Sequence, residues 1–260
     1  MERKIELRTM DVAVIGVCAA LYAVIGRLTD LGVTFIGVAF WPAAVIPAIF
    51  AVLYGPWVGG IGAAIGIFVR DMLFHHDPLL SLTAGVTSNF AMFFIIGYFS
   101  AKMLDWKKII ISLGFAIFVV TMGLLLPTLL LPSEFEVLTG LPAWEIVTIF
   151  ILTTIMSLGV IIAVSRRWSE WRSYIVGSVI GQGIGAAIVA VGVWGYSQIF
   201  FSQTGYFTSP IQATFIPIIF VWTFATEIPF VLLLGPIVAK ACLRAFPFLR
   251  QKQKTGRKGN

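Results

Sequence analysis

Long apolar stretches, each bounded by charged residues or by proline and glycine, are the feature that most restricts the fold of this chain. A helix of about 20 apolar residues crosses the hydrocarbon core of a bilayer and satisfies its own backbone hydrogen bonds there. The sequence therefore predicts an all-α, polytopic integral membrane helix bundle. Eight spans are expected, at residues 11–28, 40–54, 57–74, 82–103, 109–131, 144–165, 174–199 and 211–243.

The composition supports lipid as the solvent for most of the chain. Hydrophobic residues make up 59% of the 260 positions and charged residues 12%, against about 25% charged residues in soluble domains. A soluble globule of this size could not bury so much apolar surface, and the length leaves no room for a separate soluble domain. We therefore expect one transmembrane domain over residues 1–260, located in the cell membrane.

The distribution of lysine and arginine predicts the orientation of the bundle. With a cytoplasmic N-terminus, all of the 18 basic residues except Arg27 and Arg70 fall on the cytoplasmic side, as the positive-inside rule requires. An even number of spans then places both termini in the cytoplasm. Residues 1–10 are expected to form a retained N-terminal tail, and residues 245–260 a basic tail that lies against anionic lipid head groups.

Two of the expected spans are irregular. The span at 40–54 is short, so it is expected to tilt little or to be partly re-entrant. The span at 211–243 contains Pro217, Pro229 and Pro236, and it is expected to kink or break because proline removes a helical hydrogen bond. Similar small-residue runs in the third and seventh spans also leave open an internal repeat of four plus four spans.

Small residues line one face of the first span. They are Ala13, Gly16, Ala19, Ala20 and Ala23. Ala13, Gly16, Ala20 and Ala23 recur at steps of three and four residues, and Ala19 lies four residues before Ala23. This spacing places them close together on the helix surface, and such faces allow another membrane helix to approach closely. Two interpretations remain open, which are packing inside the bundle and docking to a separate membrane subunit.

Polar side chains at membrane depth are candidate binding residues, because placing them in lipid is costly. Glu227 lies near the middle of the last span, two residues before Pro229, and could bind a substrate, a cation or a proton. Gln182 and Asn89 lie inside two other spans. Their amides could recognise a ligand or form hydrogen bonds to neighbouring helices.

The predicted outer boundary of the bundle holds a second group of candidates. Arg70 and Asp71 end the third span just before the segment HHDP, and an ion pair from Arg70 to Asp71 or Asp77 is expected to hold this loop. No metal site is assigned, because adjacent histidines seldom bind one ion. Three aromatic residues could stack on a flat heterocycle rather than serve only as interfacial anchors: Trp41, Trp194 and Tyr196.

Sequence motifs of enzymes are missing. The chain contains no HExxH, GxSxG or CxxC motif, and Cys18 and Cys242 show no disulfide or metal spacing. It also lacks the GxxxxGK[ST] loop that binds nucleotide phosphates. We therefore expect neither an enzyme nor a cofactor, and any ATP hydrolysis must come from partner proteins.

The run WPAAVIPAIFAVLYGPWVGGIGAAIGIFVRD, which follows the small-residue first helix, resembles the N-terminal half of the substrate-binding S components of energy-coupling factor (ECF) transporters. The segments GVTSNFAMFFIIGYFSAK and LLLGPIVAKACLRAF resemble the fourth and last helices of that family. Asp71 matches the acidic end of its third helix. The family's turn before that helix is matched by Tyr54, Gly55, Pro56, Trp57 and Gly59. S components usually have six spans, whereas eight are expected here.

The resemblance implies a subunit that captures a vitamin-like or metal micronutrient at the outer face. It also implies docking, through the small-residue face of the first helix, onto a transmembrane coupling subunit driven by two cytoplasmic ATPases. We expect the substrate to contact Glu227, Gln182, Asn89, Trp194, Tyr196, Arg70, Asp71 and Trp41.

Two other functions remain open. Glu227 at membrane depth and the possible repeat would also suit a secondary transporter that uses an ion gradient. The small-residue face would suit a structural subunit of a larger membrane complex. The sequence does not select the ligand either, since a thiamine-like cationic heterocycle, riboflavin, biotin, a queuosine precursor and cobalt are all compatible with it.

Overall fold

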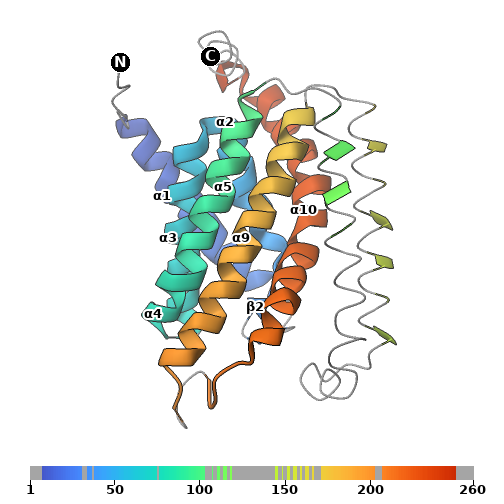
Figure 1. Cartoon of the computed structure of the whole chain (residues 1–260). Coiled ribbons are helices and arrows are strands. Elements are labelled where there is room, and N and C mark those ends of the chain that lie inside the picture. Colours follow the sequence, from blue (N-terminus) through green and yellow to red (C-terminus); the bar gives the residue numbers. More distant parts are fainter. Residues whose placement is uncertain are drawn as a thin grey trace, which may run out of the picture.

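The computed structural model describes residues 8–30, 34–36, 38–74, 76–102, 171–202 and 207–249, together with isolated residues between 107 and 166. The described chain forms a bundle of helices that run up and down beside one another (Figure 1). Five helices in this part are long and apolar enough to cross a bilayer. The predicted all-α membrane bundle is confirmed.

Four predicted spans are single long helices. The first, third, seventh and eighth spans correspond to α1 (Thr9–Leu28), α3 (Pro56–Phe74), α9 (Arg172–Ile199) and α10 (Ile216–Ala245). A short 3-10 turn, η4 (Ala213–Phe215), precedes α10.

Two further spans are composite. The second consists of the 3-10 turn η1 (Pro42–Ala44) followed by α2 (Val45–Tyr54). The fourth is built from α4 (Pro78–Leu80), the π-helical segment η2 (Ser81–Val86) and α5 (Thr87–Ser100). The remaining predicted spans, 109–131 and 144–165, fall largely outside the described residues.

The short second span crosses the bundle from one end to the other. Trp41, just before it, lies over Arg70 near the end of α3. Pro56, just after it, packs closely on Gly97 of α5. A Cβ atom added at Gly97 would lie 2.7 Å from the Pro56 Cα. The segment therefore runs from the outer part of α3 back to its start, and its 13 helical residues rise about 20 Å. Whether it tilts or is partly re-entrant in the bilayer stays a prediction.

The last span was expected to kink or break, and it does not break. α10 continues through Pro229 and Pro236 as a single helix of 30 residues, and Pro217 lies in its first turn, where a proline disrupts no helical bond. Both internal prolines are buried, and membrane helices tolerate proline where neighbouring helices pack around it.

Glycines allow the α4–η2–α5 segment and α9 to pack closely. A Cβ atom added at Gly181 would lie 2.7 Å from the backbone oxygen of Met92, and one added at Gly192 would lie 3.1 Å from the Cα of Ala84. Such close approach maximises van der Waals contact, which is a main attraction between helices in lipid.

The two ends of the bundle are formed by different segments of the chain. α1 begins and α10 ends at the same end (Figure 1), which we call the inner end because the positive-inside rule assigns it to the cytoplasm. The opposite, outer end holds an antiparallel hairpin of β1 (Thr34–Phe35) and β2 (Val38–Ala39). The connection between α9 and α10 lies at this end too.

The small residues of α1 divide between two environments. Ala19 and Ala23 are buried, and a Cβ atom added at Gly66 of α3 would lie 2.8 Å from the Ala19 oxygen. Ala13, Gly16 and Ala20 are exposed. A Cβ atom added at Gly16 would meet no described atom within 4 Å. Internal packing thus involves two of the five residues, and docking through the other three stays a prediction.

Candidate functional site

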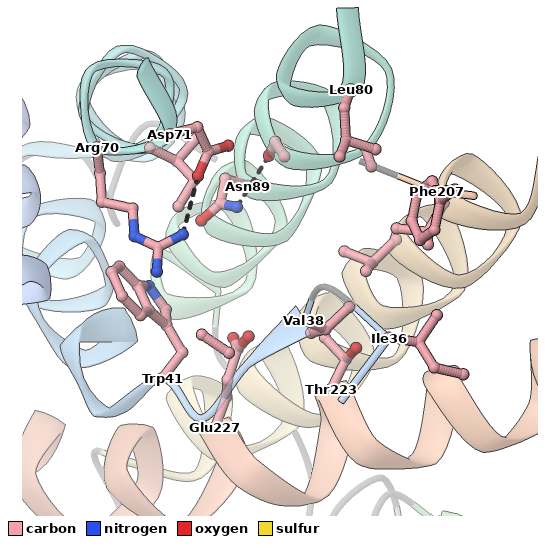
Figure 2. Close-up of a pocket in the computed structure, with 16 residues that line it drawn as sticks. Ile36, Val38, Trp41, Arg70, Asp71, Leu80, Asn89, Phe207, Thr223 and Glu227 are labelled. Atoms are coloured by element: carbon pink, nitrogen blue, oxygen red, sulfur yellow. Dashed lines mark hydrogen bonds and ion pairs between the residues drawn. The ribbon is translucent and has the colours of Figure 1, made fainter. Parts of the chain in front are cut away.

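A cavity of about 90 Å³ lies beside the hairpin at the outer end of the bundle, and Figure 2 shows the residues that line it. Its wall combines α3, the α4–η2–α5 segment, α9, α10 and the hairpin, so residues far apart in the sequence meet there. Most lining side chains are apolar and a few are polar, which is typical of small-molecule sites. The lining residues are Ile36, Val38, Ala39, Trp41, Ile67, Arg70, Asp71, Leu80, Ala84, Gly85, Asn89, Val189, Val193, Phe207, Thr223 and Glu227.

The hairpin and Phe207 cover the cavity at the outer end. Ile36, at the hairpin turn, has a φ of 46°, a conformation that β-branched residues rarely adopt. The indole Nε1 of Trp222 on α10 donates a hydrogen bond to the Val38 oxygen at 2.9 Å. Phe207 packs on Tyr196 of α9, with ring centroids 6.2 Å apart. This cover is therefore held to α9 and α10 by side chains.

Arg70 is the centre of a buried ion-pair cluster at one side of the cavity. Its Nη2 lies 2.9 Å from Asp30 Oδ2, and its Nη1 lies 3.2 Å from Asp71 Oδ1. The hydroxyl of Ser81 donates to the other Asp71 oxygen at 2.7 Å. The guanidinium also lies 4.5 Å from the centre of the Trp41 ring, in a cation–π contact. Because Asp30 and Trp41 flank the hairpin in sequence, one arginine holds both of its ends.

A chain of hydrogen bonds joins three segments beside the cavity. Trp41 Nε1 donates to the Tyr22 hydroxyl at 2.7 Å, and this hydroxyl donates to Asn89 Oδ1 at 2.6 Å. Asn89 Nδ2 donates to the Gly85 oxygen at 2.9 Å. Buried polar groups need such partners, and the chain fixes the orientation of both the Trp41 ring and the Asn89 amide.

Replacing Tyr22 by phenylalanine should lower stability by about 1–3 kcal/mol, because the buried Trp41 N–H and Asn89 oxygen would each lose a partner. We expect a lower apparent melting temperature of the purified protein in detergent. The matched control is Tyr98→Phe, since the Tyr98 hydroxyl is exposed and accepts only from Lys102 in the described hydrogen bonds. Equal melting temperatures for the two variants would contradict a stabilising role for the buried chain.

The π-helical segment η2 shapes the wall opposite Asp71. Such segments insert one residue into a helix and are frequent at functional sites. A Cβ atom added at Gly85 would lie 2.7 Å from Asp71 Oδ2. Glycine at this position therefore leaves room for the Asp71 carboxylate to reach the Ser81 hydroxyl.

Glu227 forms the α10 side of the cavity. Gln182 of α9 is fully buried behind it and donates from Nε2 to Glu227 Oε2 at 2.9 Å. No ion pair to Glu227 is found in the part of the chain that the structure describes. The carboxyl group thus lies at the cavity wall with the amide of Gln182 as its hydrogen-bond partner.

Of the eight residues predicted to contact a substrate, five line this cavity and three do not. Gln182 lies behind Glu227, and Tyr196 lies under Phe207, where its hydroxyl donates to Asp77. Trp194 is half-buried on α9 and does not belong to the lining. The five that line the cavity are Trp41, Arg70, Asp71, Asn89 and Glu227.

Sequence reasoning missed the apolar wall and several supporting polar groups. Ile67 lies three and four residues before Arg70 and Asp71, and Val189 lies four before Val193, so helical spacing could have identified the α3 and α9 parts of the wall. Asp30, Tyr22 and Ser81 gave no comparable signal, because their importance depends on partners distant in sequence.

Comparison with known families agrees with the resemblance seen in the motifs. The family model described as "ECF-type riboflavin transporter, S component" matches residues 6–166, more than half of the chain. The matched region includes the hairpin, the Arg70 cluster and Asn89, whereas Glu227 lies beyond it. No curated protein and no solved structure matches the chain.

Proposed function

The chain belongs to the family of ECF-type riboflavin transporter S components, and from this premise we propose that its outer cavity captures a riboflavin-type heterocycle for import. S components are membrane-embedded substrate-binding subunits, and the family is not a class of enzymes. They work together with an ECF module, which contains a membrane coupling subunit and ATPases. The substrate, the docking surface and the energy coupling of this chain are the parts that we propose.

The observation that carries the proposal is the chemistry of the cavity wall. Trp41 offers an aromatic surface, and Asn89 and Glu227 offer hydrogen-bonding groups on different helices. Ile67 and Val193 supply apolar surface between them. A flat ring system with one apolar edge and one hydrogen-bonding edge, such as an isoalloxazine, suits this combination.

A ring system as large as isoalloxazine can enter the cavity only if the hairpin and Phe207, which cover it, move. The cavity of about 90 Å³ is smaller than the roughly 300–1,000 Å³ of typical small-molecule pockets. The contacts that would have to break are the Trp222 to Val38 hydrogen bond and the packing of Phe207 on Tyr196. We therefore propose that substrate enters as the hairpin and Phe207 move outward.

For docking, we propose that the exposed small residues of α1 contact the coupling subunit. Ala13, Gly16 and Ala20 leave a shallow strip on a helix that otherwise exposes larger apolar side chains. A partner helix can approach closely at such a strip, and close packing replaces the hydrophobic effect as the driving force in lipid.

The double variant Gly16→Leu with Ala20→Leu should abolish docking and leave substrate binding intact. Bulky side chains would fill the strip, but Gly16 has open space around its Cβ position, so the bundle itself should fold. The measurement is co-purification of the coupling subunit, which should fall by about tenfold or more. Gly195→Leu, at another open position on α9, is the control. A stoichiometric complex with the double variant would contradict this docking surface.

The proposed function is tested by binding and uptake with the complete assembly. Purified protein should quench riboflavin fluorescence with saturable binding, and native mass spectrometry should detect the retained ligand and the co-purifying subunits. In proteoliposomes, uptake should require ATP and the co-purified ATPases.

Other outcomes would favour the alternatives. Uptake by the isolated chain under an ion gradient would indicate a secondary transporter. An empty protein in a fixed assembly with unrelated membrane proteins would indicate a structural subunit, and either result would contradict the proposal.

A further inference from the structure

A buried acceptor behind the cavity has no donor among the residues that the structure describes. Gln182 is fully buried, and its Oε1 atom has no hydrogen-bond partner in this part of the chain. Its Nε2 atom is already used, since it donates to Glu227 Oε2 at 2.9 Å and to the Thr223 oxygen at 3.4 Å. Buried polar atoms nearly always have a partner, so the Gln182 oxygen is expected to find a donor close by.

Glu227 is the acidic group next to this oxygen, and it is buried. Its side chain lies at the cavity wall (Figure 2) and is 6% exposed, and no ion pair reaches it from the described residues. The stretch at 109–165, which lies largely outside the described residues, cannot supply a cation, since it contains no lysine, arginine or histidine. A carboxylate buried without a cation is so costly that the group takes up a proton instead.

Other titratable groups near Glu227 come from α1, α2 and α3. Arg70 and Asp71 of α3 line the same cavity and form an ion pair with each other at 3.2 Å. The Tyr22 hydroxyl of α1 belongs to the hydrogen-bond chain that fixes the cavity wall. Tyr54 of α2 is the last residue of that helix, at the inner end of the bundle. The remaining lining residues do not titrate, so Glu227 is the acid at the cavity wall whose described hydrogen-bond partner is a neutral amide.

We propose that Glu227 is a proton-binding site: it is a neutral carboxylic acid in the folded protein, and its O–H group donates to Gln182 Oε1. A protonated carboxyl group has one donor and can still accept a hydrogen bond, so a single proton satisfies both the acid and the amide oxygen. The pair then joins α9 to α10 by hydrogen bonds in both directions. The proton site stands on these contacts alone, and only its effect on ligand binding rests on the proposed function.

Infrared spectroscopy of the purified full-length protein tests the proton directly, because a carboxylic acid and a carboxylate absorb at different frequencies. The difference between the spectra of the unmodified protein and of Glu227→Gln at neutral pH should contain the C=O band of a carboxylic acid. Asp11→Asn is the matched control, since it removes one acid near the start of α1, at the inner end of the bundle. Its difference spectrum should contain carboxylate bands only. Carboxylate bands alone in the Glu227→Gln difference would overturn the proposal.

Unfolding should release this proton, because a solvated glutamate ionises above about pH 4.3. The folded state then binds one more proton than the unfolded state, so its stability falls as the pH rises. Between about pH 5 and pH 7, the folding equilibrium of the unmodified protein in detergent should lose about a factor of ten per pH unit relative to Glu227→Gln. Glutamine offers an N–H to Gln182 Oε1 at every pH, so this variant should fold without that slope. Parallel slopes in the two proteins would contradict the proton site.

Titration with riboflavin separates this inference from the proposed function. An ionised Glu227 would hold water at the cavity wall, so the Kd of the unmodified protein should rise by about tenfold once the proton is lost at alkaline pH, and that of Glu227→Gln should not change with pH. If riboflavin does not bind but the acid band and the stability slope are found, the proposed function fails and the proton site stands. If riboflavin binds with the same pH dependence in both proteins and the acid band is missing, the proton site fails and the proposed function stands.

Discussion

Replacing Arg70 by methionine is expected to lower the stability of the protein by about 3–5 kcal/mol, the usual loss when a buried ion pair loses one partner. The Arg70 guanidinium is paired with Asp30 and with Asp71, and all three side chains are at most 10% exposed. Methionine retains much of the side-chain volume but leaves two buried carboxylates without their cation. We expect a strongly lowered apparent melting temperature in detergent and a reduced yield from the membrane.

Two further variants separate the loss of charge from the loss of packing. Adding Asp30→Asn and Asp71→Asn to the Arg70→Met variant removes the uncompensated charges, so about half of the lost stability should return. Arg244→Met, on the exposed inner end of α10, should change stability by no more than about 0.5 kcal/mol. A triple variant as unstable as Arg70→Met would show that packing against Trp41, rather than charge, accounts for the loss.

Replacing Gly181 by alanine should destabilise the bundle by about 1–3 kcal/mol, because the added methyl group overpacks an interface that has no space for it. Its Cβ would lie 2.7 Å from the backbone oxygen of Met92. A backbone atom cannot rotate away as a flexible side chain can, so α5 and α9 would have to separate. We expect a lower melting temperature in detergent and weaker substrate binding, since both helices belong to the wall of the cavity.

The control for this change lies in the same helix. The Cβ position at Gly195 has no neighbouring atom within 4 Å, so Gly195→Ala should be neutral or more stable by up to about 1 kcal/mol, as helix propensity predicts. An equal loss in both variants would show that α9 needs glycine for its backbone conformation and not for close packing.

The spans were predictable because lipid forces each segment to satisfy its own backbone hydrogen bonds. This constraint is local, so α9 begins within two residues of the start expected at position 174. The prediction failed where neighbouring helices decide the outcome. Pro229 and Pro236 favour a kink or a break when α10 is considered alone, and the break does not occur, since both are buried in a continuous helix.

The candidate site was predictable only in part. The cost of placing polar groups in lipid identified Asn89 and Glu227 without any structure, and both line the cavity. The same reasoning identified Gln182 as a candidate contact, and the aromatic outer boundary identified Trp194, yet neither belongs to the lining. Depth in the membrane can be estimated from position in a span, but the direction of a side chain depends on how its helix is rotated against its neighbours.

The sequence by itself therefore determined that this protein is a multi-pass membrane bundle of the S-component type, because hydropathy, basic residues and turn motifs act over short distances along the chain. Only the tertiary structure decided which polar groups meet. Asp30 reaches Arg70 across 40 residues, and Gln182 reaches Glu227 across 45. Such pairings depend on which helices are adjacent and how closely glycines let them approach, and a linear sequence leaves both undetermined.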